Sequence, residues 1–415
     1  MKLAKAIALA GALSLSFLAG PSLATDKPAI EAKFRAWLEQ VIWPEAQKQG
    51  VSRSVFDAAF KGVTLNWGLP DLVPPGEAPP PVRKQTQAEF SAPAAYFNEK
   101  SIASLAEKGR QVFSQHHSLL TRIETKYGVP GDIVVALWGR EMAFGNSGAS
   151  YSAMQVLSTK AFMSTRKDMF ETELLAALAI AQEGDIAPQS MKSSWAGALG
   201  MPQFMPTSFQ RYAVDFDRDG KKDIWNSVPD ALASIANYMA AKGWQRGRSW
   251  GFEVRIPDSV SCAQEGPDKA QPISKWVAAG IARADGKPVA ASELKGDGMM
   301  MVPAGRFGPQ FIVSPNFYVI KEYNNSDLYA LYVGNLADRI DHRGTGFAGQ
   351  WGDVGNMLRS DVEAMQLALV KKGYDVGKTD GLPGYKTRRS IGDWQQKNGV
   401  RQTCYPEESL KAKLK

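Results

Sequence analysis

The stretch from Ser194 to Asp223 constrains the fold of this chain more than any other segment. It packs a tight turn, an aromatic segment and a run of alternating carboxylates into thirty residues. Asp215, Asp217 and Asp219, followed by Gly220, repeat the first half of a calcium-binding loop, in which alternate oxygen ligands and a glycine at the bend surround one hard cation. The sequence therefore predicts an irregular, polar turn here that can hold a metal ion.

Length and composition place the chain among globular proteins. At 415 residues with 44% hydrophobic content, it is long enough for two or three domains with filled cores. The only histidines are His116, His117 and His342, so a zinc site or a histidine-dependent triad is disfavoured. Acid chemistry in this chain has to rest on carboxylates.

The N-terminus has the three regions of a secretory signal. Lys2 and Lys5 precede an apolar run over residues 6–18, and small residues follow up to Ala24. This run is too short to cross a hydrocarbon layer of ~30 Å as a helix. We therefore expect residues 1–24 to be a signal peptide that directs the chain to the periplasm, with no membrane-spanning segment. No cysteine follows the signal, so nothing supports a lipid anchor.

Charge and cysteine usage limit the partners of the chain. Removal of residues 1–24 takes away two lysines and no acid, so the formal charge falls from +7 to +5. The basic residues are spread out, which favours weak attraction to an anionic polymer over a nucleic-acid partner. Cys262 and Cys404 could form one disulfide in an oxidising compartment, but the spacing alone does not decide it.

Apolar positions at helical spacing predict a mostly helical main part. Helices are expected within residues 28–61, 90–127, 171–183 and 230–242, and another that starts after Pro130. Prolines between residues 70 and 81 predict an extended connection. Between residues 252 and 332 the pattern changes to short strands, and the best candidates are residues 252–256, 311–313 and 318–320.

The C-terminal part reads as a separate unit. Five glycines within residues 342–356 predict a flexible linker to residues 357–415. Two amphipathic helices are expected in this unit from the apolar positions Val362, Met365, Leu369 and Val370, and then Ile391 and Trp394. The unit also contains Asp380-Gly-Leu-Pro-Gly and Thr387-x-x-x-Ile. It resembles the type 1 peptidoglycan-binding domain, which is a three-helix module.

Glu141 is the candidate catalytic acid. It follows Ile133, Val134, Leu137 and Trp138 by one or two turns on one face of a predicted helix, so its carboxyl is expected on an apolar side. Desolvation there raises the pKa of a carboxyl and lets it act as a general acid near neutrality. From the spacing alone, a buried glutamate paired with a nearby arginine explains the pattern equally well.

Five separated motifs together resemble the B family of lytic murein transglycosylases. They are Gly-Arg-Glu141-Met-Ala-Phe-Gly, Ser194-Trp-Ala-Gly-Ala-Leu-Gly-Met-Pro-Gln-Phe-Met-Pro-Thr-Ser, Tyr-Ala-Val-Asp-Phe-Asp-x-Asp-Gly, Ala236-Asn-Tyr and Pro315-Asn-Phe-Tyr-Val-Ile-Lys-Glu-Tyr-Asn. The match runs in register from about Phe97 to Arg339. The resemblance implies a mainly α (α+β) fold over residues 25–341: a lysozyme-like transglycosylase core with a helical N-terminal region and a small β-containing subdomain.

The resemblance also implies a reaction. Peptidoglycan glycan strands would be cleaved at the β-1,4 bond between N-acetylmuramic acid and N-acetylglucosamine, with the muramyl 6-hydroxyl as the nucleophile and a 1,6-anhydromuramyl end as the product. Glu141 would act first as acid and then as base, although most glycosidases use two carboxylates. Glu171, Glu173 and Glu183 are expected on solvated helix faces. A lysozyme-type hydrolase and an inactive wall-binding scaffold are the alternatives, and no organic cofactor is expected.

A set of substrate-contacting residues is carried over from the same resemblance. These residues are Ser194, Gln203, Phe204, Tyr238, Tyr323, Asn324 and Arg166. The polar side chains would hydrogen-bond N-acetyl or hydroxyl groups, and the rings would face the pyranose units. Phe204 could instead belong to the core. Arg166 matches an arginine pair of the family only in part, because the next residue is Lys167.

The aspartate loop resembles the EF-hand-like site of the family. The ligands that this implies are the side chains of Asp215, Asp217 and Asp219 and the carbonyl of Lys221. Position twelve is Asn226 instead of the usual glutamate, so we expect Asp230 to close a longer loop. An aspartate-rich turn without a metal is the alternative. A bound calcium ion would stabilise the fold and take no part in bond cleavage.

Overall fold

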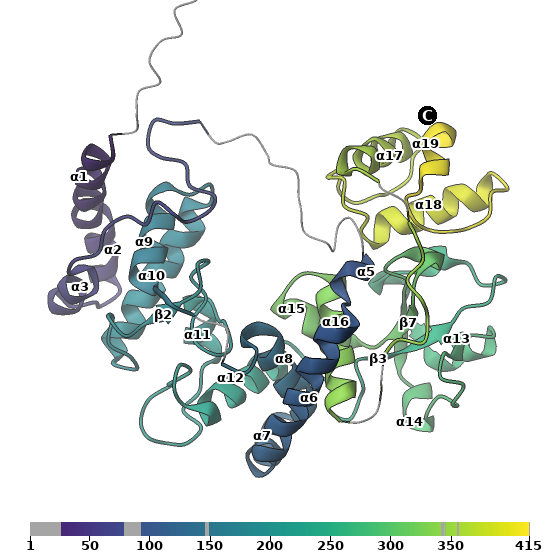
Figure 1. The fold of residues 1–415 in the computed structure, drawn as a ribbon, viewed down its shortest axis with the longest axis horizontal. Coiled ribbons are helices and arrows are strands. Elements are labelled where there is room, and N and C mark those ends of the chain that lie inside the picture. Colours follow the sequence, from purple (N-terminus) through teal and green to yellow (C-terminus); the bar gives the residue numbers. More distant parts are fainter. Residues whose placement is uncertain are drawn as a thin grey trace, which may run out of the picture.

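The structure is a computed structural model that describes residues 26–78, 93–145, 149–341, 344, 346–354 and 357–414. The expected signal peptide and the later part of the proline-rich connection lie outside these residues. Helices predominate throughout, with a small two-stranded antiparallel sheet of β1 (Tyr151–Ser152) and β2 (Lys192–Ser193) and a larger antiparallel sheet toward the C-terminal half of the main domain (Figure 1). No helix in the described part of the chain is both long and apolar enough to cross a membrane.

The N-terminal region is helical, as the apolar spacing predicts. Helix α1 (Lys27–Trp37) continues through a π-helical segment, η1 (Leu38–Ile42), into α2 (Trp43–Lys48). Helix α3 (Arg53–Phe60) begins after Ser52, whose hydroxyl accepts a hydrogen bond from the Val55 amide. Helices α2 and α3 pack against α10 (Lys167–Glu183), which also packs along α9 (Ala153–Met163).

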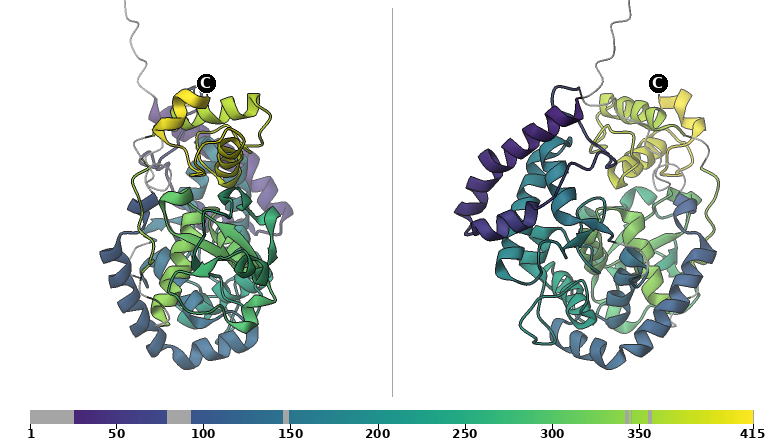
Figure 2. Two further views of the ribbon diagram at one scale, coloured as in Figure 1. Left: turned by 90° about the vertical axis from the view of Figure 1, so that its right-hand side faces the viewer. Right: turned by 60° about the vertical axis from the view of Figure 1, so that its left-hand side comes forward.

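Helix α8 (Gly131–Met142) lies at the centre of the main domain. It packs against α6 (Glu99–Gln115), α7 (His117–Tyr127), α12 (Val228–Ala241) and α16 (Asp327–Ile340). Every residue from Gly131 to Gly139 is buried, so both faces of this helix belong to the core. Figure 2 shows from two further sides how α6 and α7 wrap around this region. Short helices α5 (Pro93–Tyr96) and α11 (Pro206–Tyr212) complete the helical part.

A five-stranded antiparallel sheet forms the β-containing subdomain, with strand order β4-β6-β7-β3-β5. The strands are β3 (Gly251–Arg255), β4 (Gln271–Pro272), β5 (Ala282–Arg283), β6 (Asp297–Met301) and β7 (Gln310–Val313). Ile312 of β7 pairs with Phe252 on one side and with Met300 on the other. Helices α13 (Ile273–Ala278) and α14 (Ala291–Leu294) and the 3₁₀ turns η2 (Cys262–Gln264), η3 (Pro267–Lys269) and η4 (Gly305–Phe307) surround the sheet.

One predicted strand is wrong. Residues 318–320 belong to helix α15 (Pro315–Tyr323). The Ser314 hydroxyl caps this helix by accepting a hydrogen bond from the Asn316 amide, and Pro315 occupies the first turn, where its missing amide hydrogen costs nothing. These helix-start signals outweigh the β-propensity of the apolar residues that follow, so the segment is helical.

The C-terminal unit is a three-helix module, as expected. It contains α17 (Arg359–Lys371), α18 (Tyr385–Lys397) and α19 (Glu408–Leu414), around a small core of its own. Leu369 and Ile391 are fully buried in that core. Val370 was expected on the same face, but it is 47% exposed because it lies one residue beyond Leu369, about 100° around the helix.

The linker is not free where the structure describes it. Phe347 and Trp351 pack on Phe97 of the main domain, with ring centroids 5.3 and 5.1 Å apart from it. The carboxylate of Glu253 accepts hydrogen bonds from the amides of Ala348 and Gly349. The glycine content predicted a flexible linker, but two aromatic residues within it fix its path along the main domain.

The module is also joined covalently to the β-containing subdomain. Cys262 and Cys404 form a disulfide, with Cα atoms 6.1 Å apart, and both cysteines are buried. Beside it, Arg388 of α18 forms a buried ion pair with Glu265 and reaches Asp327 of α16. The two units therefore share an interface with its own buried polar contacts.

Candidate active site

Glu141 lies in the last turn of α8, where the helix ends abruptly. Ala143 and Phe144 both have left-handed backbone conformations, with φ of 45° and 60°, and Gly145 follows with φ of 85°. Such conformations are costly for non-glycine residues and cluster at functional sites. Phe144 folds back over the helix because Gly139 has no side chain: a Cβ there would lie 2.5 Å from the Phe144 ring. The strained turn thus sets the end of α8 directly after Glu141.

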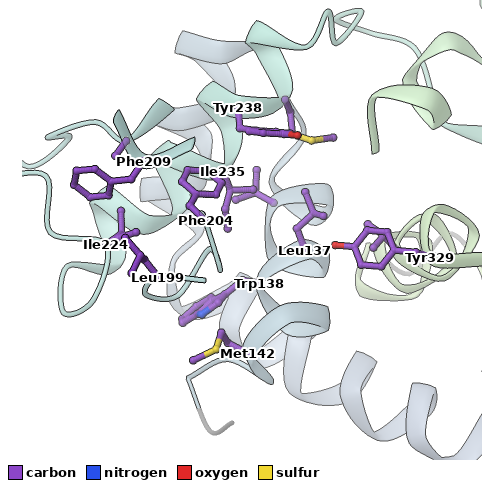
Figure 3. Close-up of a cluster of buried hydrophobic side chains, with 14 of the residues drawn as sticks. Leu137, Trp138, Met142, Leu199, Phe204, Phe209, Ile224, Ile235, Tyr238 and Tyr329 are labelled. Carbon is purple, nitrogen blue, oxygen red and sulfur yellow. The ribbon is translucent and has the colours of Figure 1, made fainter. Parts of the chain in front are cut away.

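Tyr329 of α16 holds the Glu141 carboxyl. Its hydroxyl donates a hydrogen bond of 2.5 Å to Oε1 of Glu141, and the Tyr329 side chain is almost fully buried. In Figure 3 the Tyr329 hydroxyl points toward the helix that carries Leu137. Burial raises the pKa of Glu141, and the Tyr329 hydrogen bond and the nearby Arg140 charge offset only part of that rise. The carboxyl is therefore suited to hold a proton and to donate it.

Arg140 lies among three tyrosine rings next to the acid. Its guanidinium donates to the Tyr96 hydroxyl over 2.7 Å and lies 4.6 Å from the ring centre of Tyr332 and 5.9 Å from that of Tyr329. The sequence alternative, a glutamate paired with an arginine, is thus only partly right: the Arg140 charge lowers the pKa of Glu141, but the arginine is held by tyrosines. Sequence analysis missed Tyr329, because a tyrosine in an apolar helix reads as ordinary core.

An aromatic cluster lies beside the acid. Phe204, Tyr238 and Tyr323 pack together with ring centroids between 4.9 and 6.0 Å apart, and Tyr212 adds a further ring. Tyr323 is close enough to Glu141 that the carboxylate raises the pKa of its hydroxyl, after the larger effect of burial. The cluster thus forms one side of the acid's surroundings.

Two of these rings are more buried than the resemblance implied. Phe204 is only 2% exposed and Tyr238 only 8%. Figure 3 shows both side chains within the apolar cluster that contains Leu137 and Ile235. The Tyr238 hydroxyl donates to the Glu322 carbonyl and that of Tyr323 to the Pro202 carbonyl. Phe204 is therefore a core residue that supports Tyr238 and Tyr323, which agrees with the alternative reading of the sequence. Its ring is not exposed to a substrate.

Ser194 and Gln203 hold the tight turn that the sequence singled out. The Ser194 hydroxyl accepts hydrogen bonds from the amides of Ala196 and Ala198, and the Gln203 side chain donates to the Gly200 carbonyl. Gln203 itself has a left-handed backbone, with φ of 56°. The two residues fix the loop that carries Phe204, and both remain only partly buried.

The other two carried-over residues lie at the edge or outside this group. Asn324 is exposed at the end of α15, directly after Tyr323. Arg166 is exposed at the start of α10, where its guanidinium lies 5.3 Å from the Phe170 ring. The contacts of Arg166 thus join it to α10, and the structure does not bring it to the residues around Glu141.

A cavity of about 750 Å³ lies at the C-terminal end of α8, which carries Glu141. Met142 and Gly145 line it from the end of α8, and Met201 and Trp225 line it from the segment that the sequence singled out. This size falls within the range of small-molecule binding sites, about 300–1,000 Å³. The end of α8 and part of the segment that follows Ser194 therefore border one common space, while Glu141 and Ser194 are not among the residues that line it.

Glu173 is not on a solvated face, contrary to expectation. It is 8% exposed, and its carboxylate accepts hydrogen bonds from the amide and the hydroxyl of Thr207, at the first turn of α11. It therefore caps a helix, which is a structural role. No carboxylate among the described residues contributes to the pKa shift of Glu141.

The aspartate loop brings together a smaller ligand set than predicted. Carboxylate oxygens of Asp215, Asp217 and Asp230 lie within 4.8 Å of one another, and Asp230 is fully buried. The Asp219 carboxylate lies outside this group and accepts a hydrogen bond from the Lys221 amide. Burial raises the pKa of Asp230, although the amides of Phe216 and Asp223 partly offset it. Three converging oxygens fit a hard cation such as Ca²⁺.

Two families match this chain. Residues 33–338 match the family described as transglycosylase SLT domain, and residues 359–414 match the putative peptidoglycan-binding domain. The chain is 33% identical to the membrane-bound lytic murein transglycosylase B of Escherichia coli over 237 residues, which are 56% of this chain and 63% of that relative. The chain thus spans less than two thirds of that relative's length.

Solved structures agree with this assignment. SltB3 from Pseudomonas aeruginosa, in complex with NAG-anhNAM-pentapeptide, is 34% identical with a TM-score of 0.79, over 92% of this chain and 99% of that chain. The Escherichia coli lytic transglycosylase Slt35 in complex with calcium is 25% identical with a TM-score of 0.52, over 77% and 94%. This chain therefore belongs to the transglycosylase SLT domain family and carries a peptidoglycan-binding domain at its C-terminal end.

Proposed function

We propose that this protein is a peptidoglycan lytic transglycosylase that cleaves the β-1,4 bond between N-acetylmuramic acid and N-acetylglucosamine. The observation that carries the proposal is the Glu141 carboxyl, whose pKa is raised by desolvation and which is held by the Tyr329 hydroxyl close to a cavity at the end of α8. The relative with NAG-anhNAM-pentapeptide bound supports the choice of substrate, because an anhydromuramyl sugar is the product that the proposed reaction forms.

Glu141 serves as acid and base in turn. In its protonated form it gives its proton to the glycosidic oxygen, so the bond between that oxygen and C1 of the muramyl unit breaks. The carboxylate left behind takes the proton of the muramyl 6-hydroxyl, whose oxygen forms the new bond to C1. Glu141 ends protonated again, and no water is consumed. The Tyr329 hydrogen bond orients the carboxyl for both steps.

The products decide between this reaction and hydrolysis. Sacculi digested with the protein are expected to give fragments with 1,6-anhydromuramyl ends, which are 18 mass units lighter than the hydrolytic products because one water is missing. Mass spectrometry separates the two. Reducing-end products would instead identify a lysozyme-type muramidase. If the sacculi stay intact, the protein is an inactive wall-binding scaffold.

The site of action follows from the same proposal. The signal-like N-terminus and the peptidoglycan-binding module both suit an enzyme that works on the wall from the periplasm. Fractionation of cells that express the full chain is expected to place the mature protein, cut after Ala24, in the periplasmic fraction. Retention of residues 1–24 in the protein recovered from cells would contradict this.

A calcium ion is proposed for the aspartate loop. Asp215, Asp217 and Asp230 would hold it, and it would supply structural stability at the turn before α12. The calcium complex of the related Slt35 supports the choice of ion. None of the three residues contacts Glu141 or Tyr329 in the structure, so no step of the reaction passes through this site.

A further inference from the structure

Arg388 belongs to the C-terminal module, yet it reaches into the main domain. Its guanidinium donates two hydrogen bonds to Glu265, at 2.9 and 2.6 Å, and a third of 3.3 Å to Asp327. Only 5% of the Arg388 side chain is exposed, against 1% for Glu265 and 17% for Asp327. Removal of one member would leave the others buried without full charge compensation, which is costly.

Asp327 lies where two helices of the active site meet. It is the first residue of α16, and its other carboxylate oxygen accepts a 2.7 Å hydrogen bond from Lys321 of α15. Burial alone would raise the pKa of Asp327, but Lys321 and Arg388 together hold that pKa below its ordinary value. The carboxylate therefore stays charged and ties α15, α16 and the C-terminal module to one point.

Tyr329 stands two residues after Asp327. Its amide donates to the side chain of Ser326, the residue before Asp327, so the first turn of α16 is closed by its own cap. Its hydroxyl holds the carboxyl of Glu141. The path from the module to the acid thus consists of Arg388, Asp327, one helical turn and Tyr329.

We propose that Arg388 of the peptidoglycan-binding module is a positioning residue for catalysis, which fixes the first turn of α16 through Asp327 and thereby holds Tyr329 against Glu141. This inference rests on the proposed function, because it names a residue that helps to position the same catalytic acid, Glu141. It makes the module part of the catalytic unit, in addition to its role in binding the wall.

The test uses variants of the full-length protein, of which the first leaves the net charge of the interface unchanged. The pair Arg388→Met with Glu265→Gln removes the buried charges together, a change that buried ion pairs often tolerate. Asp327→Asn removes the charge at the start of α16. Arg389→Ala is the matched control, since Arg389 lies next to Arg388 on α18 and forms its ion pair with the exposed Asp268 across the same interface, while its contact with Glu265 is a 3.5 Å hydrogen bond to the backbone carbonyl. Melting temperatures confirm that each variant is folded.

Turnover of a soluble peptidoglycan fragment is the first readout. The Arg388→Met/Glu265→Gln pair and Asp327→Asn are each expected to lower kcat about tenfold and to leave KM within about twofold. In a Tyr329→Phe background the same changes are expected to lower kcat by less than about twofold, because the contact they act through is already gone. Equal losses in both backgrounds, or a loss no greater than that of Arg389→Ala, would overturn the inference.

A second readout does not need activity. Glu141 is faced by Tyr329 and Tyr323 and by Arg140, and the Tyr329 hydrogen bond lowers its pKa. If Tyr329 is displaced, the pKa of Glu141, followed by carboxyl ¹³C NMR, is expected to rise in the Arg388→Met/Glu265→Gln pair and not in Arg389→Ala. An unchanged pKa would contradict the inference. A wild-type protein that releases no anhydromuramyl product would contradict the proposed function alone, because this measurement would still decide the role of Arg388.

Discussion

Tyr329 and Glu141 join the first turn of α16 to the last turn of α8 through one hydrogen bond of 2.5 Å. The two residues are 188 positions apart in the chain. The acid is thus oriented by a helix that comes after the whole sheet, and its properties depend on how the distant parts of the main domain pack together. The predictions below follow from this contact and from the sites around it.

Replacement of the acid gives the most direct prediction. Glu141→Gln keeps the size of the side chain but has no proton to give, so turnover is expected to fall by about 10²–10⁴-fold or more. Binding to sacculi is expected to persist, because the C-terminal module is untouched. Pull-down with purified sacculi and product analysis measure the two properties. Glu183→Gln, at the exposed end of α10, serves as control, and full activity in Glu141→Gln would refute the mechanism.

The same variant changes stability in a direction set by pH. Burial raises the pKa of Glu141 above its value in the unfolded chain, so the native state binds the proton more tightly. The wild-type protein therefore loses stability relative to Glu141→Gln as the pH rises through the raised pKa. Thermal unfolding of both proteins between pH 4 and about 9 tests this, and a constant difference over that range would show that the carboxyl is not desolvated.

Loss of the Tyr329 hydroxyl is expected to move the pH profile. The acid form of Glu141 starts the reaction, so kcat/KM falls as the pH rises through its pKa. Tyr329→Phe removes a hydrogen bond that lowers this pKa, and the falling limb should therefore move to higher pH. Tyr127→Phe is a suitable control, because the buried Tyr127 hydroxyl has no hydrogen-bond partner in the structure. A falling limb at the same pH in both proteins would show that Tyr329 does not affect the pKa of Glu141.

Calcium is expected to raise the melting temperature. An ion present at 100 times its Kd stabilises the folded state by about 2.7 kcal/mol. Asp230→Asn should remove this effect, since the buried carboxylate belongs to the converging group. Asp219→Asn should keep most of it, because its carboxylate lies outside that group. Melting curves with calcium and with a chelator provide the measurement. Identical curves for the wild type would show that the loop does not bind calcium.

Reduction of the disulfide is expected to destabilise the protein. Cys262 and Cys404 close a loop over a separation of 142 residues, and a bridge of this kind stabilises by about 2–5 kcal/mol. Cys262→Ser with Cys404→Ser should lower the urea midpoint relative to the oxidised protein. A reductant should lower the midpoint of the wild type and leave that of the double variant unchanged. Equal midpoints in all four conditions would show that the bridge does not form.

The local signals in the sequence were sufficient for most helices and for the placement of Glu141 on a buried helix. Ser52 marks the start of α3, and the apolar residues before Glu141 place it on a buried helix. The same reasoning failed where long-range contacts decide. Tyr329 has no local signal that separates it from core residues, since its function depends on a helix 188 positions away.

Two other failures have the same physical origin. The linker glycines predicted flexibility, but Phe347 and Trp351 find partners on Phe97, far away in sequence. Asp219 fits the spacing of a calcium loop, whereas Asp230 joins the group because α12 brings its first turn back to the loop. In both places tertiary packing, which local spacing does not reveal, decides which side chains come together.

The disulfide between η2 and the chain after α18 limits how the C-terminal module can move relative to the main domain. With Cys262 bonded to Cys404, the module is joined to the β-containing subdomain through η2 at one end and to the main domain by the linker at the other. The module cannot search the wall on a free tether. Under the proposed function, the place where the module binds a strand and the place where Glu141 acts are then a set distance apart, so the point of binding specifies which bond of the strand is reached.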